Sequence, residues 1–583
     1  MMFFREYERI YLYLLSVLVG VGGGLGAVVF RALTEAVGGF FFTDLLSRAP
    51  SPLFVVLLPV LGGLIVGPLS HLLAPETRGD GIVRVMEAIH RSGGSIRTRA
   101  GLVLICTSAI TLGSGGSAGR EGPIALIGAS LASTIGRLLS VDPLGRRTLV
   151  LSGLAAGIAG TFNAPMGGAI FALEVVSRRI STSEAVPILL AAVVGKAVAS
   201  SLIDPVPEFV NPSFIFTPFD IVFCFLMGPI FGCLAFLWVR SYQVIDDWFA
   251  ALPISPAIKP ALGGIVAGAC GLFLYGYGIM GVGYGGINTV FEMAHSSPTD
   301  QLILLVLVLA IAKAVATGCT VGSGGSGGLF APTLYIGTML GLSFGIMTDR
   351  IFPGLVANPP DYGLLGMGAF FAGAASAPLT CIFMITEMTG SYAALPALII
   401  SCILSYSAAD HLLGGGSMYT VKLDRQGISV GRPAAVLEGV TVDEIMARRL
   451  VVISPETTIR KVRDLIFEHN VSGFPVVEKG RLVGIIAFDD IRMVPQDKLD
   501  VLTASDLATR DVVTVTPDRS AKQAMDLLYA NRVGRLPVVS PDDPGRIMGI
   551  LTRSDIIRGY ETRVAGKPPG NASVGHPPFY PPP

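Results

Sequence analysis

The sequence predicts an α-helical polytopic membrane protein with an inverted internal repeat, followed by a small α+β domain pair. Three observations support this prediction. Residues 1–420 are apolar and poor in charge, a Gly-rich motif occurs twice within them, and residues 421–583 have the charge content of a soluble protein. The expected boundaries are 1–425 for the membrane domain, 426–562 for the domain pair and 563–583 for a disordered Pro-rich tail.

The distribution of charge separates the two parts of the chain. Of the 583 residues, 51% are hydrophobic and 14% are charged, and the mean hydropathy is +0.65. Half of the 84 charged side chains lie in residues 421–583, so about 26% of that part is charged against about 10% of residues 1–420, where about 25% is usual for soluble proteins. Lys+Arg and Asp+Glu are equal at 42 each, so the chain lacks the basic excess expected of a nucleic-acid-binding protein.

Long apolar runs recur through the first part of the chain. The clearest are 10–30, 53–73, 185–202, 221–239, 302–316 and 395–409. Several reach the ~20 residues that a helix needs to cross a bilayer. Shorter segments are broken by glycine, at 113–119 and 322–328. Broken backbone at membrane depth is tolerated only inside protein or beside a water-filled cavity, so we expect function at these breaks.

The broken segments belong to an internal repeat. Residues 111–123 read TLGSGGSAGREGP and residues 320–332 read TVGSGGSGGLFAP, 209 positions apart. A second pair, AGTFNAPMGGAIFALE at 159–174 and AGAASAPLTCIFMITE at 372–387, is 213 positions apart. Two pairs at nearly one offset indicate a duplicated membrane unit, and matched Gly/Pro-broken segments in two halves indicate a substrate site between them. With an odd number of helices per copy, the copies would be inverted and their loops would converge.

The chemistry of the repeated segment favours anions. Each copy runs into a proline, Pro123 or Pro332, at the start of an apolar helix, and such a proline marks a helix N-terminus. Glycines let the preceding N–H groups turn inward, and helix N-termini attract anions through free donors and a partial positive charge. Without a full cation, the anion is held weakly enough to be released. The alternative is that the glycines only allow close helix packing.

Glu121 is the ionisable residue that this arrangement singles out. A carboxylate inside the membrane is costly and usually functional. At the mouth of an anion site it competes with the anion, and its protonation would open the path. We therefore expect Glu121 to be a gate that responds to pH and to anion occupancy. The alternative is a salt bridge to the neighbouring Arg120.

At these residues the sequence resembles the CLC family of chloride channels and chloride/proton exchangers. GREGP at 119–123, GLFAP at 328–332 and NAP at 163–165 resemble family motifs, and the resemblance covers roughly residues 10–425. It implies a homodimer with an anion pore in each subunit, a multi-pass location in the cell's inner (plasma) membrane and both termini in the cytoplasm. It also puts the family's external gating glutamate at Glu121.

The same resemblance implies which residues bind the anion. They lie in three short stretches and at one tyrosine whose hydroxyl holds the central anion: Asp80, Gly81, Ile82, Arg120, Gly122, Gly328, Leu329, Phe330, Ala331 and Tyr419. Without the resemblance, Tyr419 would be interpreted as an aromatic residue of the membrane interface.

One departure from the family pattern concerns the first anion-binding loop. The family usually has GSGIP there, with a serine hydroxyl on the anion, and this chain has GDGIV at 79–83. An ionised Asp80 would repel chloride. We expect Asp80 either to be protonated or to turn away and leave backbone N–H groups to bind the anion, which leaves fluoride and nitrate as alternative substrates.

A second departure concerns proton transfer. Exchangers of the family usually carry an internal glutamate, and the alignment puts its position at Val175, which cannot carry a proton. Glu174 is one residue earlier and about 100° away around a helix, and its repeat partner Glu387 suggests a structural role for both. The sequence therefore favours passive conduction.

The last part of the chain has a repeat of its own. VVISP at 451–455 corresponds to VTVTP at 513–517, and VSGFPVV at 471–477 to VGRLPVV at 533–539, each 62 positions apart. Apolar residues recur at helical spacing in 459–469 and 521–530. The order of elements is strand, amphipathic helix, strand, strand, helix.

This part resembles a pair of CBS domains over about 435–560, which implies binding of an adenine nucleotide such as ATP, ADP or AMP. The family's T-x-x-D pattern is present as Thr552 and Asp555 in the second copy, whereas the first copy has Ala487 and Asp490. Thr514 is the fourth candidate nucleotide-binding residue. The alternative is a purely structural module that stabilises the dimer.

The expected function is a chloride channel of CLC type, gated by voltage or pH through Glu121. A chloride/proton or other anion/proton antiporter of the same fold is the first alternative. A CBS-regulated cation channel is another, but it would need carbonyl or carboxylate rings along the pore. We expect no enzyme activity, no required cofactor and no metal site, because the chain has no HExxH motif and its six histidines and seven cysteines are scattered without ligand spacing.

Overall fold

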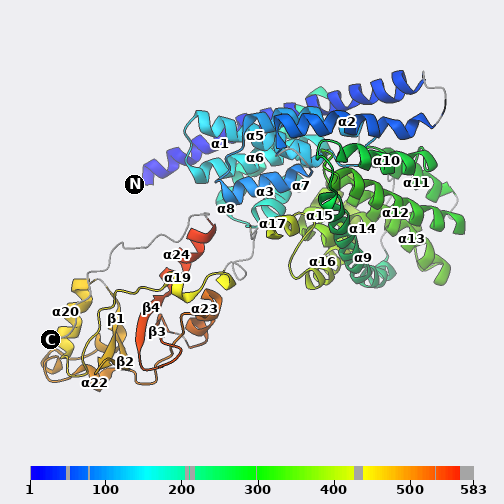
Figure 1. Cartoon of the computed structure of the whole chain (residues 1–583). Helices are drawn as coiled ribbons and strands as arrows, with labels where there is room; N and C mark the ends of the chain where they lie inside the picture. The colour runs from blue at the N-terminus through cyan, green and yellow to red at the C-terminus, as the bar shows by residue number, and fades with distance from the viewer. Residues whose placement is uncertain are drawn as a thin grey trace. The chain divides into compact units, whose positions relative to one another are not determined.

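The computed structural model describes residues 2–47, 51, 53–75, 79–203, 209, 217–296, 299–425, 428, 437–469, 471–531 and 533–564. The chain divides into two compact units, Met1–Val430 and Gly431–Pro583 (Figure 1). Residues 563 and 564, which were assigned to the expected disordered tail, belong to the last helix, which runs to Val564. The rest of that tail, 565–583, lies outside the described residues.

The first unit is helical. Its longer helices are α1 (Met2–Gly38), α2 (Phe54–Leu73), α3 (Gly81–Arg91), α4 (Thr98–Gly113), α5 (Glu121–Leu138), α6 (Pro143–Phe162), α8 (Thr182–Leu202), α9 (Pro218–Ala251), α10 (Lys259–Phe273), α11 (Tyr284–Ser296), α12 (Asp300–Gly322), α13 (Phe330–Ile351), α14 (Tyr362–Ala375), α15 (Pro378–Thr389) and α16 (Leu395–Leu413). Shorter elements are α7 (Pro165–Phe171), α17 (Thr420–Arg425), the π-helical turns η1 (Gly39–Leu45) and η3 (Ala172–Ser177), and the 3₁₀ turns η4 (Pro359–Asp361) and η5 (Tyr392–Ala394).

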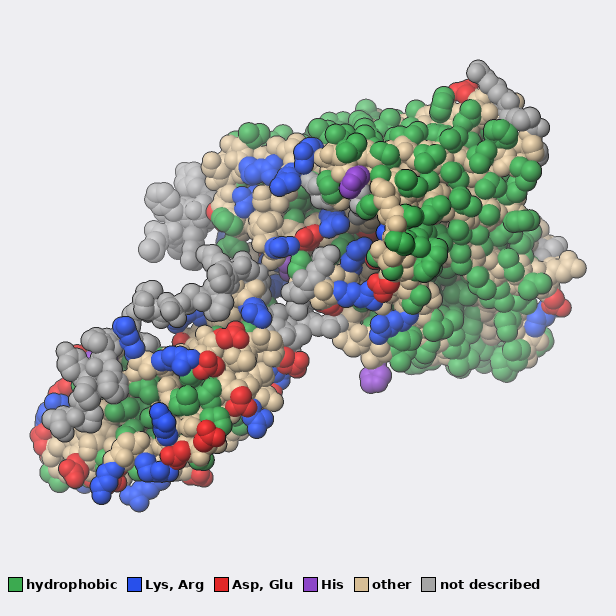
Figure 2. All heavy atoms as spheres, viewed as in Figure 1, with side chains coloured by type: hydrophobic (Ala, Val, Ile, Leu, Met, Phe, Trp, Pro, Cys, Tyr) green, Lys and Arg blue, Asp and Glu red, His purple; other side chains and the backbone are tan. Residues whose placement is uncertain are grey.

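Among the described residues, seven helical segments are long and apolar enough to cross a membrane. They are Arg9–Leu45, Phe54–Leu73, Thr182–Leu202, Pro218–Ala251, Asp300–Gly322, Phe330–Ile351 and Tyr392–Leu413. Five of the six apolar runs identified in the sequence lie within one of them, and the sixth, 53–73, begins one residue before Phe54–Leu73. Figure 2 shows hydrophobic side chains over much of the visible face of this unit, as expected of a surface that faces lipid.

The internal repeat is present in the backbone. Helices α4, α5 and α6 correspond to α12, α13 and α14, and α7 with η3 corresponds to α15. Gly115 and Gly324 occupy equivalent places after α4 and α12, with φ of 98° and 101°. Asn163 and Ser376 end α6 and α14 in the left-handed region, with φ of 57° and 54°. The breaks predicted from the sequence therefore have the same backbone geometry in both copies.

The two copies face each other across a local two-fold axis. The Gly119 N–H donates to the Gly328 carbonyl at 2.7 Å, and the Gly328 N–H donates to the Gly119 carbonyl at 2.8 Å. These residues are 209 positions apart and form an antiparallel bridge. Reciprocal contacts between equivalent residues are the signature of two-fold symmetry, so the repeat is inverted as predicted.

Glycines also bring equivalent helices into close contact. A Cβ on Gly128 of α5 would lie 2.1 Å from the Gly153 carbonyl oxygen of α6, and one on Gly153 would lie 2.2 Å from that of Gly128. Gly337 and Gly366 repeat this contact between α13 and α14, at 2.6 and 2.5 Å. Close helix packing therefore accounts for part of the high glycine content.

The second unit contains two similar α+β motifs. The first has α19 (Val442–Ile445), α20 (Ile459–His469), β1 (Gly473–Glu478), β2 (Arg481–Ala487), α21 (Phe488–Ile491) and the 3₁₀ turn η6 (Gln496–Lys498). The second has α22 (Ala504–Leu507), α23 (Ala521–Ala530), β3 (Arg535–Val539), β4 (Ile547–Thr552) and α24 (Arg553–Val564). Figure 2 shows Lys, Arg, Asp and Glu side chains spread over this unit.

Each motif is built around an antiparallel strand pair. Strand β1 pairs with β2 and β3 pairs with β4, with Gly473 opposite Ala487 and Arg535 opposite Thr552. The helices expected at 459–469 and 521–530 have those bounds. The first strand expected in each motif is reduced to one parallel bridge, from Ile453 to β1 and from Val515 to β3.

Candidate anion-binding site

Three helix N-termini meet at the local two-fold axis, those of α3, α5 and α13. The contact is close, because a Cβ on Gly81 would lie 2.1 Å from the carbonyl oxygen of Gly122. A Cβ on Gly122 would lie 2.9 Å from Asp80 Oδ1 and 3.2 Å from Gly328 Cα. Only glycine allows backbones to approach in this way. The geometry therefore concentrates N–H donors of both repeat copies in one buried place.

Glu121 is the first residue of α5, and its side chain reaches into the other copy. The residue is 1% exposed. Its Oε1 accepts a hydrogen bond from the Tyr284 hydroxyl at 2.8 Å, and its Oε2 accepts one from the Ala331 N–H at 3.4 Å. Ala331 is the second residue of α13. The carboxylate therefore occupies the donors at the N-terminus of α13, which are donors that an anion would use.

The Arg120 guanidinium lies over two aromatic rings. Its Cζ is 5.9 Å from the centroid of the Phe162 ring and 5.3 Å from that of the Tyr284 ring. Rings hold a cation through their negative faces. The positive charge of this predicted site residue is thus placed against the tyrosine that also contacts Glu121.

Asp80 points into the site. It caps α3 through its Oδ1, which accepts from the Ile82 N–H at 2.7 Å, and its Oδ2 accepts from the Leu329 N–H at 2.9 Å. The residue is 6% exposed. In this structure the carboxylate does not turn away from these N–H groups, because capping of α3 and the Leu329 N–H both draw it inward, and the other alternative, a protonated Asp80, stays a prediction. Two N–H groups predicted to bind the anion are engaged by a side chain of the protein.

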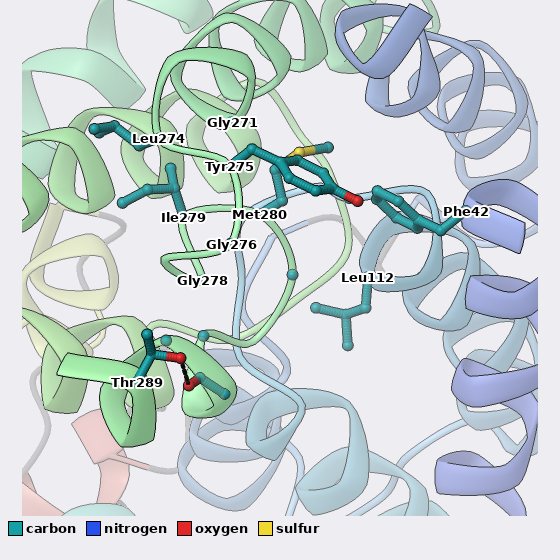
Figure 3. A pocket seen from close by; sticks show the side chains of 15 residues that line it. Phe42, Leu112, Gly271, Leu274, Tyr275, Gly276, Gly278, Ile279, Met280 and Thr289 are labelled. Carbon is teal, nitrogen blue, oxygen red and sulfur yellow. Dashed lines mark hydrogen bonds between the residues drawn. The ribbon is translucent and has the colours of Figure 1, made fainter. Parts of the chain in front are cut away.

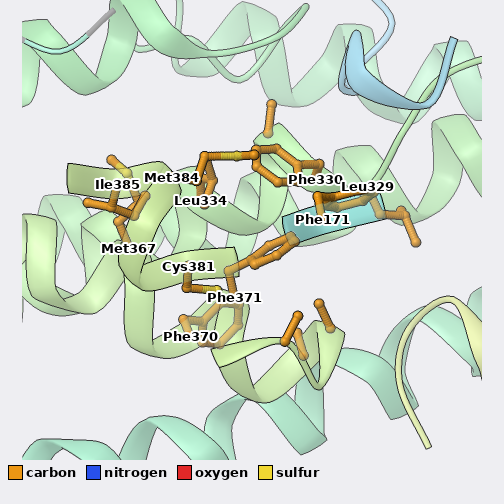
Figure 4. Packing of buried hydrophobic residues seen from close by; sticks show 14 of the residues in the cluster. Phe171, Leu329, Phe330, Leu334, Met367, Phe370, Phe371, Cys381, Met384 and Ile385 are labelled. Atoms are coloured by element: carbon orange, nitrogen blue, oxygen red, sulfur yellow. The ribbon is translucent and has the colours of Figure 1, made fainter. Parts of the chain in front are cut away.

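Tyr419 is fully buried next to the site. Its hydroxyl oxygen has no hydrogen-bond partner within the part of the chain that the structure describes. Its ring packs edge-on against Phe171 at 6.3 Å, and the ring of Phe171 is 6.0 Å from that of Phe330 (Figure 4). Buried hydroxyls are nearly always paired in folded proteins, so this unpaired donor indicates a place where a ligand binds.

Phe330 anchors the N-terminus of α13 in the core. Figure 4 shows its ring among Phe171, Phe371 and Leu334. The Phe330 and Phe371 ring centroids are 4.5 Å apart, and Phe330 is 2% exposed. Such aromatic packing fixes the helix end that carries the Leu329 and Ala331 N–H groups.

Tyr284, the residue that holds Glu121, is not among the site residues predicted from the sequence. It is the first residue of α11, and its hydroxyl donor lies 163 positions from Glu121 in the chain. The repeat contains a signal for it, because Gly79-Asp80 and Gly283-Tyr284 are each 204 positions apart, and both glycines have positive φ, 77° and 103°. Asp80 and Tyr284 therefore stand in corresponding places, each reaching the other half of the molecule.

The loop before Tyr284 is fixed by a buried lysine that the sequence analysis also did not single out. Lys313 of α12 is 0% exposed and donates to the carbonyls of Gly278, Ile279 and Gly281 at 2.9, 3.1 and 2.9 Å. A lysine within an apolar run is the signal that could have identified it. These three hydrogen bonds satisfy the ammonium group and hold the loop that carries Tyr284.

A cavity of about 430 Å³ lies on the same loop. Its lining includes Phe42, Tyr275, Met280, Gly281 and Gly283, and Figure 3 shows the Tyr275 side chain pointing toward Phe42. The loop that lines this cavity is thus the one that Lys313 binds and that precedes Tyr284.

The position that the resemblance assigns to proton transfer is apolar. Val175 lies in η3 and is buried. Glu174 beside it accepts from the Thr380 N–H at 2.7 Å, at the start of α15, and Glu387 accepts from the Gly167 N–H at 2.8 Å, at the start of α7. Each glutamate therefore caps a helix of the other copy, and the two contacts are related by the local two-fold axis.

In the second unit, two of the predicted nucleotide-binding residues contact each other. The Thr552 hydroxyl donates to Asp555 Oδ2 at 2.6 Å, and the Thr552 N–H donates to the same oxygen at 3.0 Å. This capping of α24 holds Asp555 Oδ2, while Oδ1 lies 3.6 Å from Arg558. Asp555 therefore has Oδ1 left to accept a hydrogen bond from a ribose hydroxyl.

The other two predicted residues are placed differently. Asp490 belongs to the first motif and accepts from the Ala487 N–H at 2.7 Å, so the hydroxyl of the T-x-x-D pattern is missing there. Thr514 is half-buried beside Val515, which bridges to β3. The second motif therefore has the more complete set of polar groups.

The fold and the site together define a multi-pass membrane transport protein with an inverted repeat whose broken helices converge on a buried cluster of N–H donors, the candidate anion site. The chain belongs to the CLC family, because residues 62–410 match the family model described as Voltage gated chloride channel. Residues 442–497 and 504–561 match the CBS domain. Both resemblances noted in the sequence are thus confirmed, and the family activity is anion transport across a membrane.

Relatives and solved structures agree with this assignment. A putative chloride channel protein, ClcB-like, from Ralstonia nicotianae is 33% identical over 423 residues, which cover 70% of this chain and 95% of that protein. The H⁺/Cl⁻ exchange transporter ClcA of Vibrio parahaemolyticus is 29% identical over 418 residues, covering 71% of this chain and 88% of that protein. A eukaryotic CLC transporter structure aligns with a TM-score of 0.63 at 20% identity, covering 94% of this chain and 98% of that one.

Proposed function

We propose that this protein conducts chloride passively across the membrane along a path that the Glu121 side chain closes. The observation that supports the proposal is the position of the Glu121 carboxylate, which accepts from the Ala331 N–H at the start of α13 and from the Tyr284 hydroxyl. A carboxylate and a chloride ion compete for the same donors, because both are anions. Occupancy by Glu121 therefore excludes chloride from this place.

Opening follows from the charge of Glu121. When the carboxyl takes up a proton, it loses its attraction for the α13 N-terminus, and chloride can take the Ala331 N–H. Chloride arriving from the other side can also displace the carboxylate by repulsion, which links opening to anion occupancy and to voltage. The Tyr419 hydroxyl supplies a further donor, and the absence of a full positive charge on the donors keeps the anion mobile.

Glu121→Gln tests the gate. The glutamine is neutral at all pH values, so anion flux should rise at neutral pH and lose the part of the pH response that titration of Glu121 produces. Flux of the purified protein in a planar lipid bilayer, with the external pH varied, measures both effects. If Glu121→Gln kept the pH response of the wild type, Glu121 would not be the gate.

Passive conduction is supported by the apolar Val175 at the proton-transfer position. Proton-coupled exchange is the second candidate, because Asp80 is a further carboxyl in the site and a relative at 29% identity is named as an H⁺/Cl⁻ exchange transporter. Reversal potentials measured in opposing chloride and pH gradients separate the two. We expect a reversal potential set by chloride alone, and a shift with the pH gradient would instead establish exchange.

The remaining parts of the proposal concern assembly. We infer a homodimer in the cell's inner (plasma) membrane, with a separate path in each subunit and both termini in the cytoplasm. Support comes from family membership and from the apolar surface of the first unit. Light scattering of the detergent-purified protein should give twice the 60.9 kDa chain mass, and a mass of one chain would contradict it.

A further inference from the structure

Asp80 and Glu121 each accept a hydrogen bond from a backbone N–H group at the N-terminus of α13. The N–H of Leu329 donates to Asp80 at 2.9 Å, and the N–H of Ala331, two residues further on, donates to Glu121 at 3.4 Å. Both carboxyls are buried, and a Cβ on Gly122, the residue after Glu121, would lie 2.9 Å from Asp80 Oδ1. An anion that moves along these N–H donors therefore has to replace two carboxylates, one at each N–H group.

We propose that Asp80 is a second, titratable gate in the anion path, in series with Glu121. An anion binds the Leu329 N–H only when the Asp80 carboxyl has left it, and protonation of Asp80 releases that carboxyl. The inference rests on the proposed function, because it requires that anions pass along the α13 N-terminus.

Tyr419 provides independent evidence of a ligand on the Asp80 side. Its hydroxyl is fully buried and unpaired within the described residues, and the residue interacts electrostatically with both Asp80 and Glu121. The Tyr419 hydroxyl is a free donor, whereas the Asp80 carboxylate already accepts from two N–H groups. An anion site that Asp80 closes would contain such a free donor.

Several charged or titratable groups face Asp80 from the elements around it. Glu121 of α5 repels its ionised form, and Lys422 of α17 attracts it. Lys422 is itself paired with Asp246 of α9 at 3.1 Å. Tyr242 of α9 and Tyr419 are within electrostatic range of Asp80. The repulsion between Asp80 and Glu121 couples the two gates, because neutralising either carboxyl favours the charge on the other.

The proton balance of the step is simple. A proton from water adds to Asp80 Oδ2 and forms a neutral carboxylic acid, which is a weak acceptor for the Ile82 and Leu329 N–H groups. The carboxyl then rotates away and the anion takes the Leu329 N–H. Return of the proton to water restores the carboxylate, which displaces the anion.

A purely structural role for Asp80 makes different predictions. As a cap of α3 that joins the two repeat copies, Asp80 would stabilise the fold without affecting flux. Its replacement would then lower the thermal unfolding temperature and leave the pH profile of flux unchanged. The experiment must therefore read the pH profile and not only the rate.

The test uses the full chain in phosphatidylethanolamine/phosphatidylglycerol vesicles, with chloride efflux followed by an electrode. The pH is the same inside and outside the vesicles. It is lowered from about 8 to about 4.5, a range wide enough to follow the protonation of the buried Asp80 carboxyl. Glu121→Gln removes the first gate in every sample. Asp80→Asn, Asp80→Ser or Asp220→Asn is then added. Asp220 is the matched control, because it is a buried carboxylate, 4% exposed, that accepts from the Thr217 N–H at 2.7 Å to cap α9.

We expect efflux through Glu121→Gln alone to rise by up to about tenfold per pH unit on acidification, as one-proton opening requires. Adding Asp80→Asn or Asp80→Ser should make efflux independent of pH, and adding Asp220→Asn should leave the slope in place. Asp80→Ser in the wild-type background should also tighten chloride binding in calorimetry.

Four results would overturn the inference or its basis. A flat profile for Glu121→Gln alone, or a slope that survives both Asp80 variants, removes the second gate and leaves the proposed function standing. Unchanged chloride binding in Asp80→Ser places Asp80 outside the path. No chloride efflux from the wild type or from Glu121→Gln at any pH overturns the proposed function itself.

Discussion

At the scale of single residues, the Tyr284 hydroxyl decides how firmly Glu121 is held. It donates to Oε1 at 2.8 Å, and this is a hydrogen bond to a group that carries charge only in the closed state. The hydroxyl therefore stabilises the closed, ionised form over the open, protonated one. Hydrogen bonds to charged groups contribute about 1.5–3 kcal/mol.

Tyr284→Phe should open the path at higher pH. Loss of about 1.5–3 kcal/mol from the closed form shifts the pH of half-maximal anion flux upward by about one to two units, at 1.36 kcal/mol per unit. The measurement is flux against external pH in a planar bilayer. Tyr362→Phe is the matched control, because the Tyr362 hydroxyl donates to Asp220 at 2.7 Å away from the path. A downward shift in Tyr284→Phe, or equal shifts in both variants, would contradict the assignment.

These residues also show what the sequence could predict. Glu121 and Asp80 were predicted because each lies in a short motif whose chemistry is local, a glycine turn entering a helix. Tyr284 and Lys313 were not, because their roles come from contacts across 163 positions for Tyr284 and 32–35 positions for Lys313. Nor could the sequence say that Asp80 points inward, since that direction depends on the Leu329 N–H of the other copy.

At the scale of elements, the short helices α7 and α15 are held by each other's copies. Glu174 accepts from the N–H groups of Leu379 and Thr380 at the start of α15, and Glu387 accepts from those of Met166 and Gly167 at the start of α7. Both helices begin with a proline after a left-handed residue or a short turn, so their first N–H groups have no partner in their own helix. The cross-capping supplies that partner.

Glu174→Gln and Glu387→Gln should therefore destabilise the first unit by similar amounts. Each glutamine keeps one acceptor oxygen and loses the other, at a cost of about 1–2 kcal/mol. Thermal unfolding of the detergent-purified protein should show a lower unfolding temperature in both variants. Neither should change the reversal potential in a pH gradient.

The pairing of these variants makes the result informative. If Glu174 carried protons, Glu174→Gln would alter the reversal potential while Glu387→Gln would not, although each glutamate accepts from two N–H groups at the start of the other copy's helix. Equal stability losses with unchanged reversal potentials would assign both to structure.

The fold at this scale was largely predictable. Apolar runs, glycine breaks and the two offsets of 209 and 213 positions are local or repeated patterns, and they predicted the spans and the inverted repeat. The first strand expected in each CBS motif is shorter in the structure than predicted. A run such as 451–455 is apolar enough for a strand, but it pairs with β1 through one bridge only. Pairing depends on the neighbouring strand, which a local pattern does not contain.

At the scale of the whole molecule, the net charge of zero is a sum over two units that differ in charge content and in surroundings. The first unit is poor in charge, and its anion site is made of N–H groups and hydroxyls. The second carries 39 of the 84 charged side chains of the chain, basic as well as acidic. A charged ligand such as an adenine nucleotide is therefore expected to act on the second unit.

We propose that the second CBS motif binds an adenine nucleotide, and Thr552 and Asp555 are the residues to test. Thermal unfolding of the full chain should shift upward with ATP, ADP or AMP, by an amount equivalent to about 2.7 kcal/mol when the nucleotide is at 100 times its Kd. Asp555→Asn should abolish the shift. Asp490→Asn in the first motif should retain it, because the hydroxyl partner is missing there.

Asp506→Asn separates this binding from capping. Asp506 accepts from the Thr503 hydroxyl at 2.8 Å in the same T-x-x-D geometry, at the start of α22. Both Asp555→Asn and Asp506→Asn should lower the unfolding temperature without nucleotide, since both remove a helix cap. Only Asp555→Asn should remove the response to nucleotide, because Asp506 lies outside the predicted site. No shift with any of the three nucleotides, in a chain that unfolds cooperatively, would assign the CBS pair a structural role.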